Sequence, residues 1–153
     1  MVSENQQYSR RDLLTALEKG WKHYLFQLKE LSEEEQERYA REQGFSRVQD
    51  VLVHIFVWWE HSMQRTPLVM SGHSVPPTDV DAFNAEMVEY YKQWTREAVE
   101  EKFAAVLTTF EKFLIDMPEI ALKNERIQVW LRIDAIEHYE DHHLPNAAML
   151  QEV

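Results

Sequence analysis

The chain has 153 residues, and its 27 aspartates and glutamates against 16 lysines and arginines give a formal net charge of −11. A surface this acidic repels the phosphate groups of nucleic acids and of anionic membranes, so neither is an expected partner. The chain has no cysteine, which excludes disulfide bonds, thiol catalysis and cysteine-bound zinc. Its length is that of one domain with a sizeable core, so we expect a single domain over residues 1–153.

The composition favours a helical protein without a membrane span. Glycine occurs only three times, while the good helix formers Glu, Gln, Lys, Ala and Leu are abundant. The longest apolar run, residues 55–59, is far shorter than the roughly 20 residues that cross a bilayer. The first residues lack the apolar core of a signal peptide. We therefore expect an all-α, soluble protein in the cytoplasm.

The first predicted helix begins near the N-terminus. Ser9 is a good N-cap, and Asp12 follows three residues later, as a capping pair requires. From there to about Leu31, apolar residues recur at spacings of three and four, which predicts an amphipathic helix. Gly20 lies in its middle, where glycine costs about 1 kcal/mol relative to alanine. We therefore expect a close neighbour that needs the space beside Gly20.

The next two predicted helices occupy residues 32 to 66. Ser32 is the expected cap of a short, polar surface helix that Gly44 closes. Ser46, followed by Gln49, forms a second expected capping box, which opens a strongly apolar helix. This helix is expected to weaken near Thr66, because the proline that follows disfavours α conformation in the residue before it.

The second half of the chain begins with a loop of about ten residues around residues 72–78. Helical periodicity then runs from Val80 to about Met117, with an expected restart capped by Thr95. Pro118 ends that segment, and a last helix is predicted over about residues 125–143. Four long amphipathic helices with short additional ones predict a four-helix bundle, and the long loop permits one parallel crossover.

A histidine pair on the last predicted helix is the sharpest chemical feature. His138 and His142 are four residues apart, so their imidazoles lie on one helix face and can bind one ion together. Because the chain has seven histidines, chance alone gives roughly 0.3 such pairs, so this spacing by itself is a weak signal.

A third histidine strengthens the case for a metal. His54 lies between Val53 and Ile55 in the most apolar predicted helix. A lone histidine there is more often a hydrogen-bonded core residue than a metal ligand. In a bundle, however, a histidine from one helix and a pair from another form a three-nitrogen set. Such a set leaves positions open for water or substrate, as catalytic zinc sites do.

Three segments resemble a known superfamily. SRVQDVLVHIFVWWE (residues 46–60) resembles the second helix of the DinB-like superfamily, and IEHYEDHHLP (residues 136–145) resembles its last helix. With RRDLLTALEKGWKHYLFQLKEL (residues 10–31), the chain is most similar to the ClbS/DfsB-like group within that superfamily. The resemblance covers almost the whole chain, although each motif is short.

The resemblance carries expectations about structure and function. It implies an antiparallel-type four-helix bundle with a long crossover, often dimeric, so a homodimer is expected. It implies a divalent metal ion, commonly nickel or zinc, bound by the matching residues His54, His138 and His142. Family activities include thiol transfer to small molecules and hydrolysis or detoxification of reactive compounds, as in a colibactin-resistance type. The resemblance assigns no catalytic residue here.

Residues near these histidines are candidates for supporting roles. Asp134 lies one turn before His138 and can hold its second ring nitrogen, as carboxylates near metal ligands do. His61 lies seven residues after His54 and either lines a pocket mouth or is an exposed histidine near a helix end. His143 lies about 100° around the helix from its neighbour, so we expect it to face away from the site.

The aromatic residues allow two interpretations. Trp58 and Trp59 diverge by about 100° on a helix, so one is expected in the core while the other walls a pocket or an interface. The remaining tryptophans are expected in the core or at an interface: Trp21, Trp94 and Trp130. They also suit an apolar ligand cavity built with the aromatic and methionine residues Phe56, Met63, Met70 and Tyr90.

Three hypotheses of function follow. The leading one is a metal-dependent enzyme, a hydrolase or thiol transferase, that detoxifies a small molecule. The second is a bundle that binds and sequesters a small molecule without converting it, and the third is an interaction module with merely buried histidines. If histidines bind a metal, they must be neutral, so the affinity should fall as the pH drops through the histidine range near 6.5.

Overall fold

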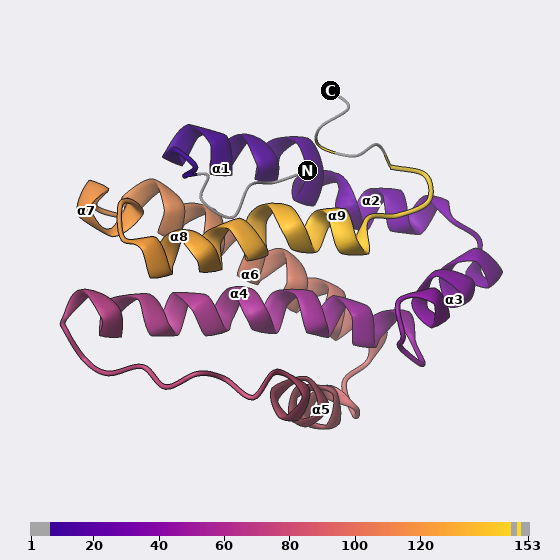
Figure 1. Cartoon of the computed structure of the whole chain (residues 1–153). Helices are drawn as coiled ribbons and strands as arrows, with labels where there is room; N and C mark the ends of the chain where they lie inside the picture. The colour runs from indigo at the N-terminus through magenta and orange to yellow at the C-terminus, as the bar shows by residue number, and fades with distance from the viewer. Residues whose placement is uncertain (1–6, 148–149, 151–153) are drawn as a thin grey trace.

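The structure is a computed structural model that describes residues 7–147 and residue 150. All regular elements among these residues are helices, which confirms the all-α fold class. In chain order they are α1 (Arg10–Ala16), the π-helical segment η1 (Leu17–Trp21), α2 (Lys22–Glu30), α3 (Glu33–Glu42), α4 (Val48–Met70), α5 (Val80–Tyr91), α6 (Arg96–Asp116), α7 (Glu119–Leu122), α8 (Glu125–Arg132), the π-helical segment η2 (Ile133–Glu137) and α9 (His138–His142) (Figure 1).

Four long helical runs form the body of the molecule: α1–η1–α2, α4, α6 and α8–η2–α9 (Figure 1). Helices α4 and α6 run in the same direction. Arg47 and Arg96, which precede and begin these helices, line one surface hollow, while Met70 and Met117 at their far ends line another. The loop after α4 and helix α5 therefore return the chain to the end at which α4 began.

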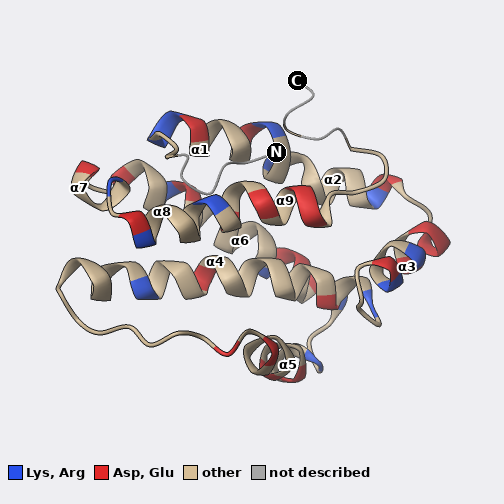
Figure 2. Ribbon diagram, viewed as in Figure 1, with Lys and Arg blue, Asp and Glu red and all other residues tan. Residues whose placement is uncertain are grey.

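Charged residues follow this arrangement. Figure 2 shows Asp, Glu, Lys and Arg on most helices, with both signs on the short outer helix α3. Helix α4 carries only three charged residues, Asp50, Glu60 and Arg65, in its 23 residues. Eleven of these 23 residues are buried, and the helix packs mainly against α6, α5 and α3.

Short-range capping signals predict most helix starts correctly. Ser9 and Ser32 both form the expected capping boxes, with Asp12 and Glu35 respectively. Thr95 caps α6 through its side chain, which confirms the expected restart.

The expected capping box of Ser46 and Gln49 is wrong. The N-cap of α4 is Arg47, whose side chain makes no capping hydrogen bond. The helix therefore starts one residue later than expected, and Gln49 is its second residue, where it cannot complete a capping box. Asp50 occupies the third position, where its carboxylate accepts a 2.8 Å hydrogen bond from the guanidinium of Arg47.

The expected weakening of α4 at Thr66 is also wrong, since the helix continues through Pro67 to Met70. A proline removes one backbone donor, and near the end of a helix few turns remain to be disrupted. Local hydrogen bonds support this last turn. The hydroxyl of Thr66 donates to the carbonyl of Ser62 at 2.8 Å, and the amide and hydroxyl of Ser71 donate to the carbonyl of Pro67 at 3.0 and 2.6 Å.

A cluster of buried aromatic rings joins the four runs. Trp21 is central to it, because its ring packs against four others at centre-to-centre distances of 5.0–6.3 Å: Tyr24, Trp59, Phe103 and Tyr139. All five side chains are at most 2% exposed. These rings come from the first run, α4, α6 and α9, so the cluster fixes the last run against α4.

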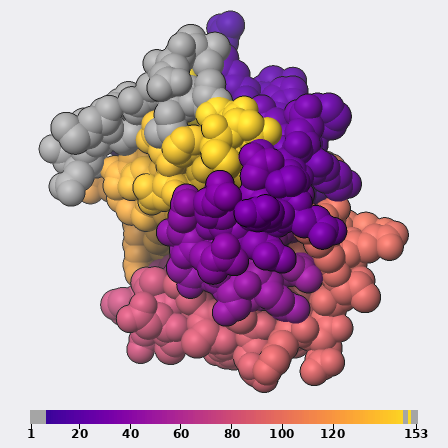
Figure 3. Space-filling view, turned by 90° about the vertical axis from the view of Figure 1, so that its right-hand side faces the viewer, coloured from indigo at the N-terminus to yellow at the C-terminus, as the bar shows by residue number. Residues whose placement is uncertain are grey.

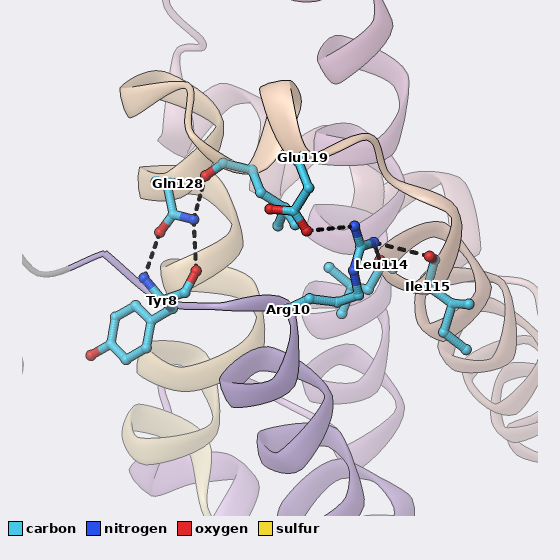
Figure 4. A network of polar contacts seen from close by, with 7 residues as sticks. Tyr8, Arg10, Leu114, Ile115, Glu119 and Gln128 are labelled. Carbon is cyan, nitrogen blue, oxygen red and sulfur yellow. Dashed lines mark hydrogen bonds and ion pairs between the residues drawn. The ribbon is translucent and has the colours of Figure 1, made fainter.

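A network of polar contacts fixes Tyr8 and Arg10 as well (Figure 4). Tyr8 and Gln128 exchange two hydrogen bonds of 2.9 Å: the amide of Tyr8 donates to the side chain of Gln128, which donates back to the carbonyl of Tyr8. The guanidinium of Arg10 donates to the carbonyl of Ile115 at 2.9 Å and to the carboxylate of Glu119 at 3.1 Å. This N-terminal network holds the first helix against α8 and the end of α6.

Gly20 has the close neighbour that its place in a helix predicts. A Cβ atom built on Gly20 would lie 2.8 Å from Cε1 of Tyr139, a distance that side chains do not tolerate. The first run and α9 therefore approach closely at this point, and only glycine leaves room for the buried ring of Tyr139.

We expect Gly20→Ala to lower the free energy of unfolding by about 1–2 kcal/mol, because overpacking outweighs the gain in helix propensity. Urea denaturation of both proteins measures this. The same substitution in a Tyr139→Leu background should cost less, because the opposing ring is gone. An increase in stability on Gly20→Ala would contradict the prediction.

Candidate functional site

Three partly buried histidines from two helices lie together. His54 comes from α4, while His138 and His142 come from α9. The ring centre of His54 is 5.3 Å from that of His138 and 4.9 Å from that of His142, and the last two centres are 5.6 Å apart. The expected juxtaposition of these rings is confirmed, while their binding of a metal ion stays a prediction.

The spacing of the rings suits a shared ion. Zinc lies about 2.0–2.1 Å from each coordinating imidazole nitrogen, and hence roughly 3.2 Å from each ring centre. Rings at tetrahedral angles around one ion therefore have centres roughly 5.2 Å apart, close to the three distances found. The nitrogens are not yet arranged for this, because no group of three or more His, Cys, Asp or Glu side chains in the described ranges is placed to hold a metal ion.

The ring nitrogens differ in their partners. Nδ1 of His54 and Nδ1 of His138 are both buried and have no hydrogen-bond partner. A buried polar atom left unpaired costs about 1–3 kcal/mol, so such atoms are rare in folded proteins. Nδ1 of His142 is paired, at 2.6 Å from Oε1 of Gln43. Because this amide oxygen only accepts hydrogen bonds, Nδ1 of His142 carries the proton and its Nε2 keeps a free lone pair.

All three imidazoles are neutral at neutral pH. Burial lowers the pKa of His54 to about 4, and the neighbouring His142 adds to this effect. Burial and the two other rings lower the pKa of His138 to about 3, and burial alone lowers the pKa of His142 to about 4. The protonation range expected near pH 6.5 therefore moves lower in the folded protein. Neutral imidazole is the form that binds metal ions.

Three residues that sequence reasoning missed support the site. Gln43 holds His142 from the end of α3, and the hydroxyl of Tyr39 in α3 donates to the carbonyl of His142. Figure 3 shows the yellow end of the last run lying against the purple α3 on this face. Asn84 of α5 accepts a 2.8 Å hydrogen bond from Nε1 of Trp58, and its side chain also interacts with His54. None of the three residues stands in a recognisable motif.

Aromatic rings lie beside the cluster, and the two tryptophans diverge as expected. Trp59 is completely buried in the core, while Trp58 is half-buried beside the site. The ring of Phe45 lies 5.3 Å from that of His54, and the ring of Phe83 lies 4.7 Å from that of Trp58. Phe45 therefore covers one side of His54.

The expected contact between Asp134 and His138 is not formed. The buried carboxyl of Asp134 interacts with Ser62 and Arg65 of α4, and its Oδ2 has no hydrogen-bond partner. Burial raises the pKa of Asp134 to about 8, although the hydrogen bond from Ser62 and the charge of Arg65 lower it. The expectation assumed a regular α-helix, whereas Asp134 lies in η2, where the wider π-helical turn changes the angular register before His138.

The remaining two candidate histidines have other partners. Nε2 of His61 is hydrogen-bonded to the hydroxyl of Thr78 at 2.7 Å, and its ring packs on Trp58 and Phe83. His61 is therefore part of the aromatic wall next to the site. Nδ1 of His143 lies 2.9 Å from the carbonyl of Glu140, where it caps the end of α9.

The suggested apolar cavity does not form from the residues named for it. Phe56 is fully buried in the core, and Tyr90 is 66% exposed. Met63 and Met70 do line a hollow of about 590 Å³, together with Phe113 and other residues of α6. This hollow lies at the far end of α4, more than two helical turns beyond His54, so it is separate from the histidine cluster.

Comparison of the chain with protein-family models, curated proteins and solved structures finds no match. Within the described part of the chain, no helix combines the length and the apolar character needed to cross a membrane.

Proposed function

We propose that His54, His138 and His142 bind one divalent metal ion, zinc or nickel, and that the protein is a metal-dependent enzyme acting on a reactive small molecule. The observation that carries the proposal is the gathering of three neutral, partly buried imidazoles at the ring spacing of a shared ion. From the sequence resemblance, the proposal also includes the four-helix bundle fold of the DinB-like superfamily. Within that superfamily, the chain is most similar to the ClbS/DfsB-like group. A cytoplasmic homodimer belongs to the same proposal.

The donor set suits this chemistry. Imidazole nitrogens bind zinc and nickel well, and three of them leave coordination positions open. A metal ion bound by neutral ligands keeps its full charge, so it can acidify a bound water or thiol and polarise a substrate carbonyl. The two unpaired Nδ1 atoms of His54 and His138 are available to a ligand. Rotation of the rings about their side-chain torsions is the adjustment that binding requires.

The chain's own residues have distinct roles in this proposal. Gln43 fixes the proton of His142 on Nδ1, which leaves its other nitrogen to bind. Asn84 interacts with His54 and is itself held by Trp58, so it fixes the face of the site that α5 covers. Phe45 and the neighbouring aromatic rings exclude water, which strengthens electrostatic interactions within the site.

A specific observation supports a second candidate, a protein that sequesters a small molecule. The hollow between the ends of α4 and α6 has a volume of about 590 Å³, within the range of sites that hold small ligands. Its lining is largely apolar, with Met63, Phe113 and Met117 among its residues. In this alternative the protein retains an apolar compound without converting it.

Metal analysis of protein purified without a histidine tag tests the proposal. About one zinc or nickel ion per chain supports it, and protein that stays metal-free after incubation with either ion contradicts it. A panel of electrophiles and esters, offered with and without a small thiol, then separates the two candidates. Metal-dependent conversion supports the enzyme, while binding without conversion supports sequestration.

A further inference from the structure

Two tryptophans donate hydrogen bonds to consecutive carbonyls of η2. Nε1 of Trp59 donates to the carbonyl of Asp134 at 3.1 Å, and Nε1 of Trp21 donates to the carbonyl of Ala135 at 3.0 Å. All four residues are at most 1% exposed. The two indoles come from different runs, α4 and η1, and pack edge to face with their ring centres 5.0 Å apart.

Such bonds lie where a π-helical segment leaves the backbone short of a donor. The amide of His138 donates to the carbonyl of Ile133, five residues earlier, instead of four. Where the ladder returns to α-helical spacing, one carbonyl is left without a backbone donor. In a dry core an unpaired carbonyl costs about 1–3 kcal/mol. An indole N–H, which only donates, suits this position.

The form of η2 decides where the histidines of α9 point. His138 follows η2 directly, and His142 lies one turn later. If the chain before α9 adopted regular α-helical spacing, each later residue would shift by about one position, which is roughly 1.5 Å along the axis and 100° around it. That shift would turn both rings away from His54.

We propose that Trp59 and Trp21 are positioning residues, whose indole N–H groups hold η2 in its π-helical form and thereby hold His138 and His142 against His54. The consequence for metal binding rests on the proposed function, whereas the effect on the rings does not. Trp59 is the better placed of the two, since it lies five residues after His54 on α4 and so ties one helix of the site directly to the other.

Trp59→Phe tests this, because phenylalanine keeps an aromatic ring in the core and removes only the donor. Two controls accompany it. Trp94→Phe makes the same substitution at a site 36% exposed and outside the core, and Leu114→Ala removes buried side-chain volume from α6 without touching η2. The readouts are proton–nitrogen NMR signals of the imidazole rings, hydrogen exchange of the amides in α9, and zinc affinity by chelator competition.

In metal-free Trp59→Phe we expect shifted imidazole signals of His138 and His142 and faster amide exchange in α9. Zinc affinity should fall about 10–100-fold, as for other groups that orient metal ligands. Neither control should show these changes, even where Leu114→Ala lowers overall stability. Trp21→Phe should show the same changes and serves if Trp59→Phe does not fold.

Imidazole signals and exchange rates that match those of the controls would overturn the positioning role. If wild-type protein binds no zinc, the proposed function fails, but the signals of the metal-free protein still decide the role of the tryptophans. Shifted signals with unchanged zinc affinity would overturn the link between these tryptophans and the metal.

Discussion

His138→Ala is expected to abolish stoichiometric metal binding. The substitution removes one of the three proposed ligand rings, and the ring centre of His138 lies within 5.6 Å of both of the others. Changes to groups that merely orient a ligand cost about 10–100-fold in affinity, so the loss of a ligand should cost more than 100-fold. Chelator competition and metal analysis of the purified variant measure this loss, and any metal-dependent conversion should disappear with it.

His143→Ala is the matched control for this experiment. It removes an imidazole close in sequence to the same pair, but one whose ring caps α9 at the carbonyl of Glu140 and lies outside the cluster. We expect it to keep the metal content of the wild type. A His138→Ala variant that retains one ion per chain would rule out the proposed site, whatever the activity of the protein.

Asp134→Asn is expected to stabilise the protein above about pH 8 by several kcal/mol. Because burial raises the pKa of Asp134 to about 8, the folded state keeps its proton where the unfolded state, with a pKa near 3.8, has lost it. The contribution of Asp134 to the stability of the wild type is therefore greatest below about pH 4. It loses about 1.4 kcal/mol per pH unit until about pH 8, and the loss then levels off. Asparagine has the same shape and carries no charge, so it avoids this loss.

The three histidines change the stability with pH in the opposite direction, so the experiment must cancel their contribution. Their pKa values in the folded state are lowered to about 3–4, so their contribution to stability is present above about pH 6.5 and is lost as the pH falls. Urea denaturation of wild type and Asp134→Asn at pH 5, 7 and 9 cancels this shared trend. The exposed Asp116→Asn controls for the change of net charge. A stability difference that stays constant with pH would contradict the burial of an uncharged Asp134.

The sequence predicts the parts of this fold that depend on near neighbours. Capping by Ser9, Ser32 and Thr95 is visible because a cap and its partner lie within three residues. The histidine cluster is foreseeable for a similar reason. A spacing of four places His138 and His142 on one helix face, and an apolar setting indicates that His54 is buried.

The rest depends on long-range contacts or on single-residue irregularities. Gln43 is 99 positions from His142, and no local pattern links the two. The π-helical segments escape periodicity because one wide turn hardly changes an apolar pattern that extends over a whole helix. That irregularity is also why Asp134, expected at His138, is instead found beside Ser62 and Arg65.

The paired hydrogen bonds between Tyr8 and Gln128 affect how the protein unfolds. They join positions 120 residues apart, so they close most of the polypeptide into a single loop. The entropy of closing a loop grows only with the logarithm of its length, so joining such distant positions costs little more than a short closure. Tyr8 is thereby tied to α8, which continues through η2 into α9 with its two histidines, so we expect the first helix and the last run to melt as one cooperative unit.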